Sequence, residues 1–185
     1  MSGKRKLARA AILAAAIALP AAAQEAKPES TVKSFYAWVL AHPMRAMPPA
    51  RERAQLAKLL SPKLVQLLGD AAATEARCVK SAPKGEKPDI LEGDLFVNNH
   101  EGASEVAYGE ARRDRDAMSV EANLVYIDRR YPRAHPFRAV AWRDWLELGL
   151  TDGRWLIEDI KFADNRSFAA SLGEYVESGR KNCKA

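Results

Sequence analysis

Apolar residues recur at helical spacing in the first third of the chain. One stripe consists of Val32, Phe35, Tyr36, Val39 and Leu40. These positions follow the i, i+3, i+4, i+7, i+8 pattern of an amphipathic helix. We expect this helix to begin at Ser30, which can cap it. We expect it to end before Pro43, because a residue that precedes proline avoids the helical conformation.

Two further helices are predicted after this one. Pro48 and Pro49 open a short helix that extends through Leu60. Ser61 then provides an N-cap, and Pro62 occupies the first position of the next helix, where proline is favoured. One face of this third helix carries Leu64, Leu67, Leu68, Ala71, Glu75 and Cys78.

The period of the pattern changes to two after a loop at residues 80–93. The predicted strands cover residues 104–112, 118–126, 137–150 and 154–162. In the second of them, apolar and polar residues alternate as in a half-buried strand. Asp152-Gly153 between the last two is a strong β-hairpin signal. A final amphipathic helix follows, with Gly179 as its expected C-terminal cap, and it carries Phe168, Leu172, Tyr175 and Val176.

Helices followed by antiparallel strands and a last helix predict an α+β fold. We expect N-terminal helices packed against a curved antiparallel sheet of about four to five strands, with a C-terminal helix. Residues 30–179 would form a single cone-shaped domain with a pocket inside. Residues 24–29 are a polar lead-in and residues 180–185 a C-terminal tail.

The first 23 residues have the order of a secretory signal peptide. A basic region precedes the ten apolar residues 10–19, and Ala21-Ala22-Ala23 provides a cleavage site before Gln24. The apolar run is too short to span a bilayer, which needs about 20 residues, and no cysteine follows it for lipid attachment. We therefore expect a periplasmic or secreted protein with no membrane anchor after cleavage. An uncleaved anchor helix is the alternative.

The charge balance argues against nucleic acid as a partner. The chain has 29 basic and 24 acidic residues, but four bases and no acids lie in residues 1–23. The remaining chain has 25 basic residues against 24 acidic ones, so its net charge is +1. A nearly neutral domain lacks the long-range field that attracts a polyanion.

Cys78 and Cys183 are the only cysteines of the chain. An even count in an exported protein favours a disulfide bond. A bond within the chain is the expected arrangement, and a bond between chains or two free thiols are the alternatives.

Three segments resemble a bacterial family of exported proteins of unknown function. They are TVKSFYAWVL at 31–40, DILEGDLFVNN at 89–99 and WLELGL…DGRWLIEDIKF at 145–162. That family is similar in turn to the nuclear-transport-factor-2-like superfamily, the cone-shaped α+β fold shared with ketosteroid isomerase and scytalone dehydratase. The most particular features are the helical Phe35-Tyr36 pair and the step formed by Gly93, Asp94 and Phe96. The resemblance implies a fold and a compartment, and it implies no reaction.

The last hairpin supplies candidate ligand-binding residues. With a two-residue turn at Asp152-Gly153, Leu150 would oppose Trp155, Leu148 would oppose Ile157, and Leu146 would oppose Asp159. One face of the hairpin would then carry Trp142, Trp155 and Asp159, and Trp38 could face them from the first helix. Asp94 could line the mouth of the pocket. The alternatives are a core role for each Trp, a solvated Asp159, and a turn role for Asp94.

The segment 128–138, DRRYPRAHPFR, supplies candidate partner-binding residues. Arg129, Arg130, Tyr131 and Arg133 belong to it, and arginine and tyrosine are enriched in binding hot spots. The alternative is a solvated hairpin end.

The sequence contains none of the common catalytic or phosphate-binding motifs. Its three histidines lie in separate loops without the spacing of metal ligands, so we expect no metal and no cofactor. The leading hypothesis is a non-enzymatic module that binds a small apolar or amphipathic molecule in the cone, or a protein at its rim. One alternative is an isomerase or dehydratase that uses an inner acid. The other is an inhibitor or immunity-type protein that binds through residues 128–138.

Overall fold

The computed structural model describes residues 27–43, 47–114 and 117–184. The predicted signal peptide and residues 24–26 of the predicted polar lead-in lie outside these residues, whereas Pro28 and Glu29 of the lead-in belong to α1. The elements are α1 (Pro28–Ala41), α2 (Ala50–Leu56), α3 (Pro62–Ser81), β1 (Glu105–Asp114), β2 (Ala117–Ile127), β3 (Ala139–Thr151), β4 (Arg154–Lys161) and α4 (Phe168–Asn182). The α+β prediction is confirmed, with four strands in the sheet.

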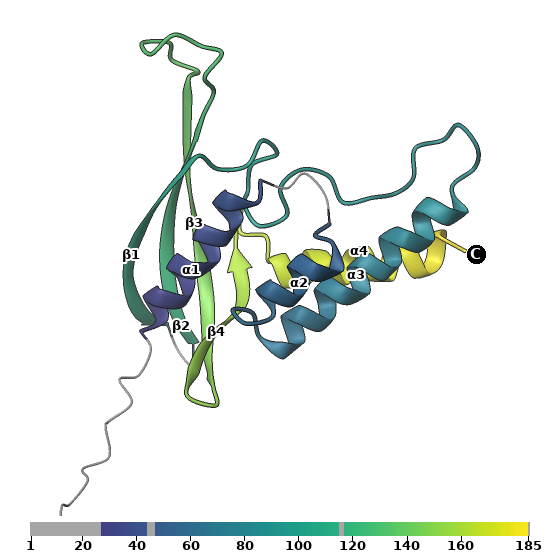
Figure 1. Cartoon of the computed structure of the whole chain (residues 1–185), viewed down its shortest axis with the longest axis horizontal. Coiled ribbons are helices and arrows are strands. Elements are labelled where there is room, and N and C mark those ends of the chain that lie inside the picture. The colour runs from purple at the N-terminus through teal and green to yellow at the C-terminus, as the bar shows by residue number, and fades with distance from the viewer. Residues whose placement is uncertain (1–26, 44–46, 115–116, 185) are drawn as a thin grey trace, which may run out of the picture.

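The sheet is an antiparallel meander in the order β1-β2-β3-β4 (Figure 1). Inward-facing residues alternate along β2 and β3, where Val120, Ala122, Leu146 and Leu148 are buried. This is the period of two that a sheet with one covered face requires. The sequence therefore placed the strands correctly, because their core face is the apolar one.

Helix α1 lies across one face of the sheet and packs against β1, β2 and β4 (Figure 1). The segment between α2 and α3 pairs with the sheet edge at β4 through a short parallel bridge. Ser61 N donates to Ile157 O at 2.8 Å, and Ile157 N donates to Leu59 O at 2.9 Å. Helix α4 packs against α3 and β4. Among the described helices, none combines the length and apolar character needed to cross a membrane.

The caps of the helices differ in part from those expected. Ser61 caps α3 as predicted, and its Oγ accepts from Leu64 N at 3.2 Å. Ser30 does not cap α1, which begins at Pro28 with Lys27 as its N-cap. Proline is favoured at the first helical position because its missing N–H would have no partner there.

Helix α4 continues past Gly179, where the sequence predicted its end, to a cap at Cys183. Gly179 serves the packing of two helices. A Cβ at this position would collide with Thr74 Cγ2 and lie 3.5 Å from Cys78 Sγ. The absence of a side chain thus lets α4 approach α3 closely.

Cys78 and Cys183 form an intramolecular disulfide with a Cα–Cα distance of 4.7 Å. The bond joins the C-terminal ends of α3 and α4, which run side by side in the same direction (Figure 1). It confirms the pairing favoured by the sequence.

Candidate functional site

The β3–β4 hairpin has the predicted register only near its turn. Leu150 pairs with Trp155 and Leu148 with Ile157, as expected. The expected pair of Leu146 with Asp159 is wrong, because the register shifts between Glu147 and Leu148. A bulge adds one residue to β4, so Asp159 pairs with Glu147 and Ile160 takes the inner position opposite Leu146.

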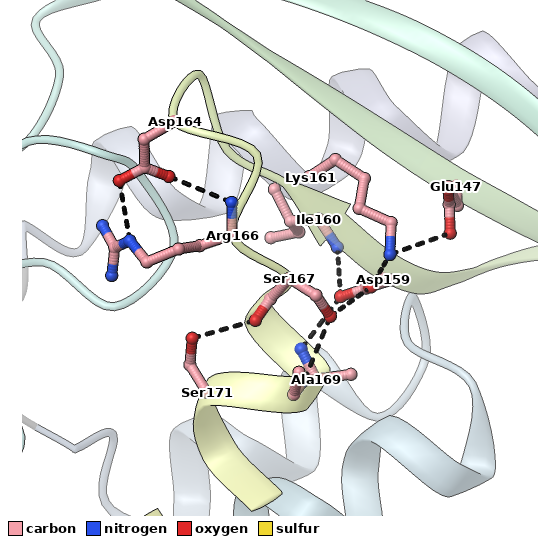
Figure 2. A network of polar contacts seen from close by, with 10 residues as sticks. Glu147, Asp159, Ile160, Lys161, Asp164, Arg166, Ser167, Ala169 and Ser171 are labelled. Carbon is pink, nitrogen blue, oxygen red and sulfur yellow. Dashed lines mark hydrogen bonds and ion pairs between the residues drawn. The ribbon is translucent and has the colours of Figure 1, made fainter. Parts of the chain in front are cut away.

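Asp159 joins β4 to the start of α4 (Figure 2). Its Oδ1 accepts hydrogen bonds from Ile160 N at 2.8 Å and Ala169 N at 2.9 Å. Its Oδ2 accepts from Lys161 Nζ at 2.7 Å and Ser167 Oγ at 2.5 Å. Burial disfavours the ionised form, but these hydrogen bonds outweigh burial and lower the pKa of Asp159. A carboxylate with four donors anchors a helix end and has little capacity left for a ligand.

We expect Asp159→Ala to lower the free energy of unfolding by about 2–3 kcal/mol at pH 7, because a backbone N–H in the first turn of α4 and the other donors to this carboxylate lose their acceptor. The pKa of Asp159 is lower in the folded state than its ordinary 3.8. Its contribution is therefore complete above pH 3.8 and disappears as the pH falls through the lower folded value. Urea unfolding at several pH values tests this, with Asp152→Asn on the exposed turn as the control. A loss of equal size in strong acid would contradict it.

The three candidate tryptophans do not meet in one site. Trp38 donates from Nε1 to Gln55 Oε1 at 2.9 Å and stacks on His42 with ring centroids 4.5 Å apart. Trp155 lies beside Leu150 near the hairpin turn, eight positions along β3 from Trp142. At about 3.3 Å per residue the two positions are roughly 26 Å apart. Each tryptophan is half-buried against a different part of the core.

Asp144 is a buried acid that the sequence reasoning missed. It is 0% exposed and lies on the inner face of β3, between Trp142 and Leu146. Its Oδ2 accepts from Trp142 Nε1 at 3.2 Å and its Oδ1 from Ala163 N at 3.1 Å. Burial raises its pKa. The signal was present, because position 144 shares the even-numbered alternation of 142 and 146.

A cavity of about 290 Å³ opens between the loop 91–100 and the first turns of α4. Of the five candidate ligand-binding residues, only Asp94 lines it. The apolar part of the wall consists of Leu91, Leu95, Val97, Phe162, Phe168 and Leu172. The polar part of the wall consists of Glu92, Asp94, Asn98, Asn99, His100, Arg166 and Ser171. The cavity thus combines apolar and polar groups, as small-molecule sites do.

The Gly93-Asp94-Leu95-Phe96 step shapes this cavity. Gly93 has a φ of +80°, and a Cβ there would lie 2.7 Å from His100 Nδ1, so only glycine fits. Asp94 Oδ1 accepts from Phe96 N at 3.1 Å and closes a tight turn. The Phe96 ring then points into the core, against the rings of Phe35 and Phe168, with both centroid distances 5.5 Å. The turn role of Asp94 and its place in the cavity wall therefore exist together.

Asp94 is only 9% exposed, and burial raises its pKa to about 6. The hydrogen bond from Phe96 N opposes this shift without cancelling it. Arg166 also lines the cavity, but its guanidinium donates to Asp164 Oδ2 at 2.7 Å and to Asn98 Oδ1 at 2.8 Å. Figure 2 shows the Asp164–Arg166 pair. Among the described residues, Asp94 has no ion pair with Lys or Arg within 4.0 Å.

We expect Asp94→Asn to raise the free energy of unfolding by about 1–3 kcal/mol at pH 7.5, because the variant no longer buries an unpaired charge. The folded pKa of about 6 exceeds the ordinary 3.8. The penalty of the wild type is therefore absent near pH 4 and complete above pH 6. Urea unfolding at pH 4 and pH 7.5 should show a gain only at the higher pH. A gain of the same size at both values would contradict this account of Asp94.

The candidate partner-binding residues do not line the cavity. Arg129, Arg130, Tyr131 and Arg133 are exposed in the long connection between β2 and β3, which projects beyond the sheet (Figure 1). They form a second surface.

One group of potential metal ligands exists among the described residues. Atoms of Cys78, Asp89 and Cys183 lie within 4.8 Å of one another. Both sulfurs are bonded to each other, and a disulfide sulfur is not the thiolate that metals require. The two cysteines therefore form a covalent link and do not act as metal ligands in this state.

Comparisons of this chain with protein-family models, with curated proteins and with solved structures find no match.

Proposed function

We propose that this chain is an exported small-molecule-binding protein, and that its ligand occupies the cavity between the loop 91–100 and α4. The ligand would have an apolar body and a hydrogen-bond-donating head, preferably a cationic one. The observation that carries the proposal is Asp94, a buried acid with a single backbone hydrogen-bond donor, in the wall of a cavity that has both an apolar and a polar part. The carboxylate of Asp94 would accept a hydrogen bond from the head of the ligand.

A comparison of the four aspartates that are buried among the described residues supports this role. Asp159 has four donors, Asp144 has Trp142 Nε1 and Ala163 N, and Asp128 has the guanidinium of Arg130. Asp94 has one backbone donor at 3.1 Å. A buried charge with so few partners destabilises the fold. Such a cost is typical of residues kept for binding or catalysis.

The size of the cavity limits the ligand. Ligand pockets usually measure about 300–1,000 Å³, and this cavity lies at the lower end with about 290 Å³. Phe162, Phe168 and Leu172 offer a surface for one ring or a short alkyl chain. The proposed ligand is therefore a small amphipathic amine or alcohol rather than a lipid with long chains.

Two further features agree with a module of this kind outside the cytoplasm. Disulfides persist mainly in oxidising compartments, and Cys78 is bonded to Cys183. The leader-like first 23 residues point to the same periplasmic or secreted location. Helices packed on one face of a four-stranded meander are also compatible with the cone-shaped superfamily that the sequence resembles.

A thermal-shift panel of matched compounds tests the proposal. The probes are 2-phenylethylamine, 2-phenylethanol and phenylacetate, together with hexylamine, hexanol and hexanoate. At pH 7.5 we expect amines to stabilise the protein most, alcohols less and carboxylates not at all, because Asp94 is ionised above its pKa of about 6. At pH 5 the advantage of the amines should disappear.

Two variants make the panel specific. Asp94→Asn should lose the preference for amines while keeping the response to alcohols, and Asp152→Asn on the exposed turn should behave as the wild type. A response to amines that Asp94→Asn retains would contradict the proposed site. The proposal is also contradicted if no compound of the panel stabilises the wild type.

The cavity also favours a second candidate, an isomerase or dehydratase that uses an inner acid. Asp94 and His100 line the same cavity, and an acid with a pKa of about 6 is suited to proton transfer near neutral pH. Exchange of the α-protons of cyclohexanone in D₂O, followed by proton NMR, distinguishes it from the binding module. Exchange that depends on protein and is lost in Asp94→Asn indicates an enzyme.

A further inference from the structure

The connection between β2 and β3, residues 128–138, is a surface that the proposed cavity does not use. We call it the arginine loop. It lies at the end of β3 opposite to the β3–β4 turn (Figure 1). Phe137 is 71% exposed and Tyr131 is 38% exposed. Exposed apolar groups that lie together with a polar rim mark interaction sites, whereas single ones need no explanation.

Internal hydrogen bonds fix the shape of the arginine loop. Asp128 N donates to Arg138 O at 2.7 Å, which closes its base. The buried Asp128 carboxylate accepts from Arg130 N at 2.9 Å and pairs with the Arg130 guanidinium at 2.7 Å. These donors lower the pKa of Asp128 to about 2. Arg138 Nη1 donates to Tyr131 O across the loop.

The aromatic rings of the loop form a continuous row. Tyr131 stacks on His135 with centroids 4.3 Å apart and planes 16° apart. Phe137 follows with its centroid 5.6 Å from that of His135, and Phe137 N donates to His135 Nδ1 at 3.2 Å. The row is therefore ordered before any partner arrives, which reduces the entropy lost on binding.

The arginine loop also carries an excess of cations. The loop has four arginines, at positions 129, 130, 133 and 138, against the single acid Asp128. Asp128 and Glu101 both interact with Arg130 and raise its pKa. Arg129 and Arg133 are exposed, and they leave a local positive charge on a domain whose overall charge is nearly balanced.

We propose that the arginine loop binds an acidic segment of a partner protein, with the row Tyr131–His135–Phe137 as the apolar centre and Arg129 and Arg133 as the charged rim. Arginine and tyrosine are the residue types that dominate hot spots. Complementary charge at the rim accelerates association and selects an acidic partner.

The structure favours a protein over a membrane as the occupant. Phe137 is the one large, fully apolar side chain that the loop exposes, whereas insertion into lipid depends on a larger apolar area. The stacked Tyr131 and His135 carry polar atoms, and the loop holds them in one fixed arrangement. A defined arrangement of rings and cations matches a folded or peptide surface better than fluid headgroups.

Selection from a displayed library of random dodecapeptides tests the proposal, because such a library samples acidic and non-acidic segments alike. The purified protein should enrich peptides rich in Asp and Glu over the starting library. A selected peptide should bind the Arg129→Ser/Arg133→Ser variant at least 10-fold more weakly than the wild type at low salt. Phe137→Ser should weaken binding about 5-fold or more while leaving the salt dependence unchanged.

The control is Arg51→Ser/Arg154→Ser, which removes two exposed arginines elsewhere and should bind as the wild type. The proposal would be overturned if no acidic peptide is enriched, or if the loop variants bind the selected peptide with wild-type affinity. Vesicles containing phosphatidylglycerol provide the competing case. Binding to vesicles through Phe137, with no enrichment of acidic peptides, would assign the loop to membranes and overturn the proposal.

Discussion

Replacing both Cys78 and Cys183 by alanine is expected to lower the free energy of unfolding by up to about 4.7 kcal/mol, the value of the chain-entropy model for a loop of about 100 residues. The disulfide closes a loop with a sequence separation of 105 residues. Its removal also frees the end of α4, which Gly179 holds close to Thr74 of α3. Urea unfolding of the oxidised wild type and the double variant measures the loss.

Reduction of the wild type provides the control for this prediction. The reduced wild type should unfold at nearly the same urea concentration as the double variant, because both lack the same covalent link. Hydrogen exchange should increase first in α4, whose last turn the bond anchors. A loss of less than about 1 kcal/mol would mean that α4 is held by packing alone.

Phe96→Ala should be the most destabilising single core substitution near the cavity, with a loss of about 3–5 kcal/mol. Phe96 is 1% exposed and contacts the rings of Phe35, Trp38 and Phe168. It therefore attaches the loop 91–100 to both α1 and α4. Chemical unfolding measures the loss, and Phe137→Ala is a matched control because that ring is 71% exposed. Equal effects of the two substitutions would contradict the core role of Phe96.

The sequence predicted the local elements because each has a short-range cause. Ser61 and Pro62 mark the start of α3 through capping chemistry, and Asp152-Gly153 makes the hairpin turn with φ values of 50° and 73°. The period of two in β2 and β3 follows from one covered face of the sheet. Such features depend on neighbours within a few residues, and a single sequence contains them.

The candidate site depended on long-range packing, and the sequence predicted it less well. A bulge in β4 shifts the register and moves Asp159 away from its predicted partner Leu146. The carboxylate of Asp159 then accepts hydrogen bonds from the start of α4. The cavity brings Asp94 together with Phe168, which is 74 positions later in the chain. Only the motif of Gly93, Asp94 and Phe96 pointed to this place. The structure adds the positive φ of Gly93 and the hydrogen bond that closes the turn at Asp94.

The ionisation of Asp94 is the property on which the proposed binding site depends most. The carboxyl carbon resonance of Asp94, followed by NMR from pH 4 to pH 8, reports it directly in the intact protein. We expect a midpoint at about 6 in the free protein, since burial raises the pKa of this carboxyl, and a lower midpoint when 2-phenylethylamine is present. A midpoint near the ordinary 3.8 that the amine does not change would contradict a ligand site at Asp94.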